Sequence, residues 1–254
     1  MTLENSLTAV VPGLNAALKN GVMHLQLDNP ASRNALGLPV VEALISTLEQ
    51  IQANDVHCLV IAANGPAFCA GLDLKDLDKR SDGDLLHLLL RIEIMLQKVY
   101  YAPCKTIAMA EGAAFGAGAD LVAACRVRIG TPALKMAFPG IKFGVFLGTR
   151  RLVSRIGSAE AERVLTGAGI LRGEEAAALG LLTDLSEPSG WPDILDQHLA
   201  TAQQLDPYIS RHMGAMISRD HSSEDLADLV RSASQPNLKD RIKTYVDSMS
   251  KAKG

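Results

Sequence analysis

Hydrophobic and polar positions alternate along the first part of the chain between strand-like and helix-like periods. Residues 21–30, GVMHLQLDNP, alternate apolar and polar side chains and stop at Asn-Pro, which predicts a strand and a turn. Residues 37–54 carry apolar side chains at the spacing of a helix. Residues 56–64, VHCLVIAAN, form a continuous apolar run, as expected of a strand that is buried on both faces.

The same order continues through the middle of the chain. Residues 84–100 have helical spacing, CKTIAMA at 104–110 predicts a second buried strand, a helix is expected from about Asp120, and VRIG at 127–130 predicts a short strand. Strands that alternate with helices in this way predict an α/β architecture with crossover connections. Beyond about Trp191 the segments are amphipathic and free of strand signals, which predicts a C-terminal helical extension covering either a partner subunit or the protein's own core.

Composition narrows the class of protein. The chain has 254 residues, enough for a large domain, and 48% of them are hydrophobic but only 4% aromatic, so an aliphatic, alanine-rich core is expected. A net charge of −3 without a dense basic stretch argues against a nucleic-acid partner. The most apolar run, LLHLLL, is too short to span a bilayer, and MTLENSLTAV lacks the features of a signal peptide. We therefore expect a cytoplasmic protein without a membrane partner.

The four cysteines add little chemistry. They are scattered through apolar surroundings and show neither zinc-ligand spacing nor a disulfide pattern, which predicts buried free thiols and no metal site. This usage of cysteine suits a reducing compartment.

Two glycine- and alanine-rich turns resemble each other. AFCAGLD at 67–73 and EGAAFGAGADL at 111–121 each follow a buried strand and lead towards a helix. Backbone N–H groups at such points lack internal partners and can bind negative charge, and two of them together would form an oxyanion hole. Tight strand-to-helix packing explains the small residues equally well. A P-loop is excluded because no Gly-Lys-Ser/Thr follows.

Asp120 closes the second of these turns and is followed by apolar residues. A carboxylate in a first helical turn interacts favourably with the helix dipole, which is a sufficient structural reason for it. A desolvated carboxyl group, however, has a raised pKa and is a candidate acid or base. The sequence leaves both interpretations open.

Four segments together resemble the crotonase superfamily, also called the enoyl-CoA hydratase/isomerase family. They are LDNPASRNAL, AFCAGLDLKDL, GAAFGAGADLVAACRVRIG and RLVSRIGSAEAERVLTGAGILRGEEAAALGLL, and they occur in the family's order over about residues 21–185. The resemblance implies an α/β fold with a crotonase-like ββα spiral core at residues 1–190. It also implies a C-terminal helical oligomerisation region at 191–254, in a homotrimer or a dimer of trimers.

The resemblance also implies roles for individual residues. The backbone N–H groups of Leu72 and Ala117 would bind the thioester oxygen of an acyl-CoA substrate, and Asp120 would be the catalytic acid or base. No cofactor beyond the coenzyme A moiety of the substrate is implied. The residues that it places along the CoA moiety are Arg33, Ala70, Gly71, Leu72, Asp73, Lys75, Gly116 and Ala117; for Arg33 and Lys75, an ordinary solvated surface is the alternative.

The chain departs from the family at the second catalytic carboxylate. The position that holds a glutamate in typical hydratases is Gly140 here, and the turn that follows is shortened to GVFLGTRRL. Glycine cannot hold or activate water, so two-carboxylate hydration is not expected. We expect the shortened turn to make the acyl pocket apolar through Phe143, Val145 and Phe146. A residue that shares the work of Asp120 would come from His87, Glu93, Tyr100 or Tyr101.

The leading hypothesis is therefore an acyl-CoA-processing enzyme of the enoyl-CoA hydratase/isomerase type, a lyase or an isomerase. Three alternatives remain open. A non-catalytic acyl-CoA-binding protein with a degenerate site would explain Gly140, and a CoA-thioester hydrolase needs only one carboxylate. A purely structural helical oligomer would leave the two similar turns unexplained.

Overall fold

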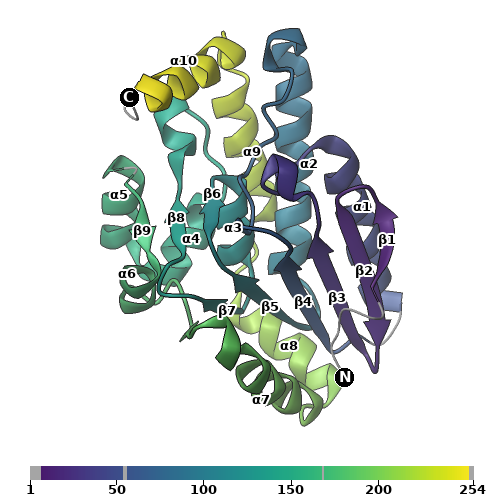
Figure 1. Ribbon diagram of the computed structural model, residues 1–254. Helices are drawn as coiled ribbons and strands as arrows, with labels where there is room; N and C mark the ends of the chain where they lie inside the picture. The colour runs from purple at the N-terminus through teal and green to yellow at the C-terminus, as the bar shows by residue number, and fades with distance from the viewer. Residues whose placement is uncertain (1–6, 54–55, 168, 252–254) are drawn as a thin grey trace.

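A seven-stranded sheet forms the centre of the computed structural model, which describes residues 7–53, 56–167 and 169–251 (Figure 1). The strands stand in the order β1-β2-β3-β4-β5-β7-β10. Strands β1 to β3 pair antiparallel, and β3 to β10 pair parallel. Their bounds are β1 (Thr8–Val11), β2 (Leu14–Lys19), β3 (Val22–Leu27), β4 (Cys58–Ala63), β5 (Lys105–Ala110), β7 (Val127–Gly130) and β10 (Asp184–Leu185).

A second sheet of three short strands continues from β5. Strand β6 (Ala113–Phe115) pairs parallel with β8 (Lys135–Ala137), which pairs antiparallel with β9 (Leu171–Arg172). Helix α3 (Ala117–Ala124) begins directly after β6, and all of its residues are buried. Since α3 begins at Ala117, three residues earlier than the sequence predicts, Asp120 lies within its first turn.

Helices cover both faces of the large sheet. Helices α1 (Leu38–Glu49) and α2 (Asp82–Tyr100) contribute to the main hydrophobic core, together with α3. On the opposite face, Leu195 and Ala202 of α7 (Trp191–Gln203) pack against Val60, Ile107 and Ile129. The continuous apolar runs predicted as buried strands are thus confirmed as β4 and β5, because each is covered on both sides, and the predicted short strand at 127–130 is confirmed as β7.

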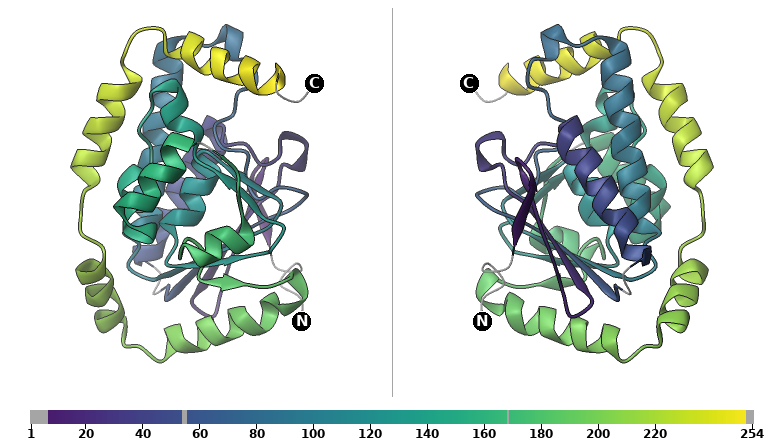
Figure 2. Two further views of the ribbon diagram at one scale, coloured as in Figure 1. Left: turned by 90° about the vertical axis from the view of Figure 1, so that its left-hand side faces the viewer. Right: turned by 90° about the vertical axis from the view of Figure 1, so that its right-hand side faces the viewer.

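The remaining helices run around the outside of this core (Figure 2). They are α4 (Thr149–Ile156), α5 (Ser158–Gly167), α6 (Gly173–Ala178), α8 (Pro207–Ile217), α9 (Ser222–Ala233) and α10 (Leu238–Lys251). Short 3₁₀ helices lie between them and earlier in the chain: η2 (Pro30–Ser32), η3 (Gln50–Ala53), η4 (Leu77–Lys79), η5 (Pro139–Phe143) and η6 (Pro188–Gly190).

The expected helical character beyond Trp191 is confirmed, since α7 to α10 fill that part of the chain. Helices α9 and α10 pack on α2, where Leu85 and Leu89 meet Leu229 and Ile242. Part of the extension therefore covers the protein's own core. The division into a core at 1–190 and an oligomerisation region at 191–254 stays a prediction. Within the described ranges, no helix has the length and apolar character that a membrane crossing needs.

Candidate active site

The two small-residue turns lie side by side and are joined by backbone hydrogen bonds. The Cys69 N–H donates to the Ala113 carbonyl at 3.0 Å, and the Phe115 N–H donates to the Cys69 carbonyl at 2.9 Å. A further bond of 3.0 Å runs from the Phe68 N–H to the Glu111 carbonyl. The turn after β4 and the segment that enters α3 therefore form one rigid unit.

Close approach of the two backbones explains the glycines. A methyl group on Gly118 would lie 2.3 Å from the Cys69 carbonyl oxygen, and one on Gly112 would lie 2.0 Å from that of Pro66. Gly71 has a φ of +85°, and a methyl group there would lie 2.4 Å from the Phe115 carbonyl oxygen and 3.2 Å from the Ala117 nitrogen. Tight packing is thus one reason for the small residues, as the sequence suggested.

The same turns leave two amides without partners. The backbone of Leu36 forms hydrogen bonds with Gly71 and Asp73, the two neighbours of Leu72. The Leu72 N–H itself makes none of the hydrogen bonds found among the described residues. Ala117 is the first residue of α3, and its N–H is likewise unpaired within that part of the chain. Gly116 differs, because its N–H donates to the Ala137 carbonyl at 2.8 Å. Packing alone does not require these two free donors.

Asp120 lies one helical turn from the Ala117 amide and is 5% exposed. Its Oδ1 atom is buried and has no hydrogen-bond partner. Burial raises the pKa of this carboxyl group well above its ordinary value; the charge of Arg151 opposes that rise, and the charge of Glu93 adds to it. Asp120 thus lies in the first turn of α3, where the helix dipole favours a carboxylate, and it is also desolvated, as a candidate acid or base would be.

Gly148, at the start of α4, packs directly on this carboxyl group. A methyl group on Gly148 would lie 2.1 Å from Asp120 Oδ1, and its φ of +67° also favours glycine. The Gly-Thr that opens α4 in the sequence GTRRL thus closes one side of the carboxyl site. Sequence reasoning did not single out this residue.

A network of charged side chains surrounds the site. Arg151 of α4 is 2% exposed and donates two hydrogen bonds, of 2.8 and 2.5 Å, to the two oxygens of Glu93 on α2. Its NH1 atom also lies 3.4 Å from Asp225 of α9. Arg150, the preceding residue, bonds Asp225 at 2.7 Å and Asp228 at 2.5 Å. Sequence reasoning named Glu93 but missed the arginine that holds it.

The other titratable residues of α2 and its end lie elsewhere. His87 is exposed, and its charge adds to that of Arg91 in lowering the pKa of Glu42 on α1. The Tyr100 hydroxyl contacts Ser154 Oγ at 3.2 Å, and the Tyr101 hydroxyl accepts from the His221 N–H at 2.9 Å. Of the four candidates, Glu93 is thus the one whose charge acts on Asp120.

The backbone at Gly140 is packed closely against the turn that follows it. Its carbonyl oxygen accepts a hydrogen bond of 2.9 Å from the Val145 N–H, and a methyl group on Gly140 would lie 2.8 Å from the Val145 carbonyl oxygen. The shortened turn folds back over this position. A glutamate side chain at Gly140 would therefore displace the turn.

The expectation of an apolar acyl pocket made by Phe143, Val145 and Phe146 is wrong. Phe143 packs on Tyr245 of α10, with ring centroids 5.4 Å apart, and Val145 is buried among Leu85 and Leu229. Phe146 is 45% exposed. The turn is too short to aim all three side chains at one place, so they separate among different neighbours.

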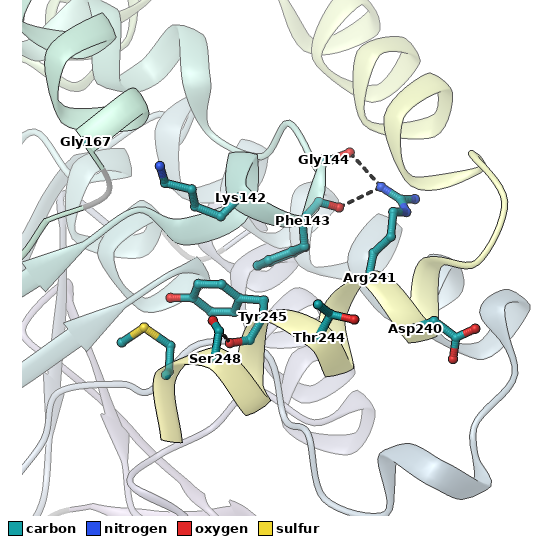
Figure 3. A pocket seen from close by; sticks show the side chains of 10 residues that line it. Lys142, Phe143, Gly144, Gly167, Asp240, Arg241, Thr244, Tyr245 and Ser248 are labelled. Atoms are coloured by element: carbon teal, nitrogen blue, oxygen red, sulfur yellow. Dashed lines mark hydrogen bonds between the residues drawn. The ribbon is translucent and has the colours of Figure 1, made fainter. Parts of the chain in front are cut away.

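Two cavities flank this turn. The first, of about 330 Å³, reaches Gly148 and contains four charged side chains; it is lined by Glu93, Phe146, Gly148, Thr149, Arg150, Asp225 and Asp228. The second, of about 720 Å³, lies between η5 and α10, where Phe143 and Tyr245 face each other and Lys142 points towards the segment at Gly167 (Figure 3). Asp120 is in the lining of neither cavity, but Gly148, which packs on its carboxyl group, lines the smaller one.

The residues expected along CoA lie beside the first turn. Arg33 and Lys75 are exposed, and neither side chain makes an ion pair within the described ranges, so both are free to meet phosphate. The Arg33 carbonyl accepts from the Ala70 N–H at 2.9 Å. Asp73 is engaged: its Oδ1 accepts from the Lys75 N–H at 2.9 Å, and its Oδ2 lies 3.6 Å from Arg80.

The cysteines are all buried and free, as predicted. Burial raises the pKa of the Cys69 thiol to about 12, although it lies in the first turn. The thiol therefore stays protonated at neutral pH and is a poor nucleophile.

The fold and the paired turns place the protein in the class with the crotonase fold. A family model described as enoyl-CoA hydratase/isomerase matches residues 17–246. The crystal structure of a Bordetella parapertussis protein, assigned as an enoyl-CoA hydratase/isomerase, is 38% identical and superposes with a TM-score of 0.90 over 92% of this chain and 98% of that one. The chain belongs to the enoyl-CoA hydratase/isomerase family.

Curated relatives agree on the family. The enoyl-CoA isomerase/hydratase fer4 of Mycosarcoma maydis is 32% identical over 73% of this chain and 72% of its own length. The human mitochondrial methylglutaconyl-CoA hydratase is 28% identical over 66% of this chain, and the match spans about half of that protein, 51%. An enoyl-CoA hydratase of Thermobifida fusca, solved with acetoacetyl-CoA, shares the fold at 21% identity and a TM-score of 0.74.

Proposed function

We propose that the protein catalyses proton transfer next to the carbonyl of an acyl-CoA thioester, with Asp120 as its acid and base. The unpaired amides of Leu72 and Ala117 carry this proposal, because they stand on adjoining turns with a buried carboxyl group one helical turn away. A thioester oxygen held by both amides would gain negative charge in the reaction, and fixed donors stabilise such charge.

The chemistry needs a single carboxylate. Asp120 removes a proton from the α-carbon, the C–H electron pair moves towards the thioester oxygen, and the enolate is held by the two amides. Return of the proton at a different carbon completes an isomerisation. In an elimination, the enolate electrons form the Cα–Cβ double bond, the β-substituent leaves with its bonding electron pair, and Asp120 returns the proton to it. A buried carboxyl group with a raised pKa is a stronger base once ionised, which suits this step.

Hydration by two carboxylates is not proposed. Gly140 leaves no second group at the usual place, and the Val145 carbonyl occupies the space beside it. The CoA moiety would lie along the first turn, with Arg33 and Lys75 near its phosphates and the backbone of Ala70 near its adenine. No metal or further cofactor is part of the proposal.

A panel of CoA thioesters tests the proposed function. The panel holds 2-enoyl, 3-enoyl, 3-hydroxyacyl, β-diketo and aromatic acyl esters, and products are followed by mass spectrometry with Asp120→Asn as the matched control. We expect a mass-neutral or eliminated product with the wild type alone. Free CoA as the product would instead indicate a thioester hydrolase. Binding without any product would indicate a non-catalytic acyl-CoA-binding protein.

We also propose that helix α8 contacts further copies of the chain, in a homotrimer or a dimer of trimers. Five apolar or aromatic side chains on this helix are exposed: Tyr208, Ile209, Met213, Met216 and Ile217. Met216 is 86% exposed and Ile217 is 73% exposed, which is costly for a monomer in water.

Met216→Glu is therefore expected to lower the oligomeric state. Sedimentation equilibrium should give a trimer or hexamer for the wild type and smaller species for the variant, because a charge would be buried in the interface. Gln203→Glu, a similar change at an exposed polar site on α7, is the matched control. A wild-type monomer at micromolar concentration would contradict the proposed assembly.

A further inference from the structure

The buried ion pair between Arg151 and Glu93 has a feature that a purely structural ion pair does not require. Arg151 uses both terminal nitrogens on Glu93, yet its Nε atom is buried and has no hydrogen-bond partner. Asp120 Oδ1 is an unpaired acceptor in the same region. Buried polar groups are rarely left unpaired, and they concentrate where function requires it. One donor and one acceptor thus stand unused around the same carboxyl site.

Both charged groups lie next to the Asp120 site. Gly148, which packs on the Asp120 carboxyl group, precedes Arg151 by one turn of α4, and Glu93 lines the same cavity as Gly148. The charges of the two groups act on Asp120 in opposite directions. The guanidinium of Arg151 stabilises an ionised Asp120, whereas the carboxylate of Glu93 disfavours it. Arg151 donates no hydrogen bond to Asp120 among the described contacts, because its two terminal nitrogens are bonded to the Glu93 carboxylate at 2.8 and 2.5 Å, and both side chains are almost fully buried. Fixed charges in a dry site interact more strongly than exposed charges do.

Other ionisable groups near α3 do not replace this pair. Helix α2 also brings Tyr100, and α4 brings Arg155, whose guanidinium bonds the Ala123 carbonyl at the far end of α3. Cys69 faces α3 from the first turn but stays protonated. Asp225 of α9 forms an ion pair of 3.4 Å with Arg151. Among the described residues, Arg151 and Glu93 are the groups whose charges reach Asp120.

We propose that Arg151 and Glu93 are positioning residues that together set whether Asp120 holds its proton in the resting protein. This inference rests on the proposed role of Asp120 as acid and base. The pair supplies two opposed charges, so each half moves the protonation of Asp120 in its own direction.

Single substitutions of the two residues should therefore have opposite effects. Glu93→Gln removes the negative charge, and the midpoint of Asp120 titration should fall by about one pH unit or more. Arg151→Gln removes the positive charge, and the midpoint should rise by a similar amount. Arg151→Lys keeps the charge and should leave the midpoint near that of the wild type. Glu42→Gln, in the partly exposed Arg91–Glu42 ion pair between α1 and α2, is the matched control and should cause no shift.

Carboxyl ¹³C NMR of aspartate-labelled protein measures this midpoint directly, with the Asp120 signal assigned by its absence in Asp120→Asn. The pH dependence of kcat on a converted thioester should shift in the same directions.

Arg151→Gln leaves Glu93 buried without its partner, so this variant could fail to fold. The double variant Glu93→Gln/Arg151→Met removes both charges and should return the midpoint of Asp120 titration towards that of the wild type.

The two readouts separate this inference from the proposed function. Opposite shifts in the NMR titration support the positioning role even if no thioester in the panel is turned over, in which case the proposed function fails alone. Unmoved midpoints, or shifts in one direction for both residues, would overturn the positioning role while turnover could continue to support the proposed function. The positioning role would also be overturned if the Asp120 midpoint of the double variant differed from that of the wild type by as much as the midpoint of either single variant does.

Discussion

The Asp120→Asn variant is expected to lose turnover and to gain thermal stability. Turnover of the thioester that the wild type converts should fall by about 10²–10⁴-fold, the usual contribution of a positioned acid or base. Affinity for the CoA ester should change little, because the substitution leaves the amides of Leu72 and Ala117 in place. Steady-state kinetics and calorimetric binding measure the two quantities separately.

The gain in stability follows from the burial of Asp120. Burial raises the pKa of the folded carboxyl group well above its ordinary value, which is near 3.9 in an unfolded chain. The folded state therefore favours the protonated form. The stability that this preference contributes is fully present below the unfolded pKa and is lost as pH rises through the folded pKa. Asparagine cannot ionise, so the variant escapes this loss.

Thermal unfolding from pH 4 to pH 9 measures the effect. At pH 8 the melting temperature of Asp120→Asn should exceed that of the wild type by roughly 3–5 °C for each unit by which the fold raises the pKa of Asp120, because one pKa unit corresponds to about 1.4 kcal/mol. The difference should shrink towards pH 4. Asp247→Asn, an exposed position on α10, is the control and should give no difference. Equal melting temperatures at every pH would mean that Asp120 ionises in the fold without cost.

Local patterns predicted the elements whose identity depends on local residues. Strands β4 and β5 and helix α1 carry their signal within their own residues, as uninterrupted apolar runs or helical spacing. Strands β6, β8 and β9 have two or three residues each, and they exist because segments distant in the chain pair with one another. Such strands have no period of their own. The hairpin of β1 and β2 was also missed, although Pro12-Gly13 marks its turn, because its strands are largely exposed.

The site was predictable only in part, for a related reason. Asp120 and the free amides follow from a turn whose small residues are visible in the sequence. The charges around Asp120 come from α2, α4 and α9, and their meeting depends on tertiary packing. Arg150 and Arg151 are adjacent and chemically identical, yet Arg150 is 41% exposed and Arg151 is 2% exposed. No composition or spacing rule distinguishes them.

The Gly71→Ala variant is expected to lose about 10²–10³-fold in kcat/KM, the cost of losing one oxyanion donor. Gly71 precedes Leu72, and an added methyl group would lie 2.4 Å from the Phe115 carbonyl oxygen and 3.2 Å from the Ala117 nitrogen. A φ of +85° is also strained for alanine. The methyl group must therefore push apart the two turns that carry the proposed donors.

Gly83→Ala distinguishes this effect from a general cost of replacing glycine. Gly83 lies in the first turn of α2, has no positive φ, and a methyl group there would find its nearest neighbour, Ser81 Oγ, at 3.6 Å. Alanine favours a helix, so this control should keep its activity and be slightly more stable. Circular dichroism at the assay temperature should show both variants folded. If folded Gly71→Ala turned over its thioester as fast as the wild type, the spacing of the two turns would not matter to the reaction, and Leu72 and Ala117 would not form the oxyanion hole.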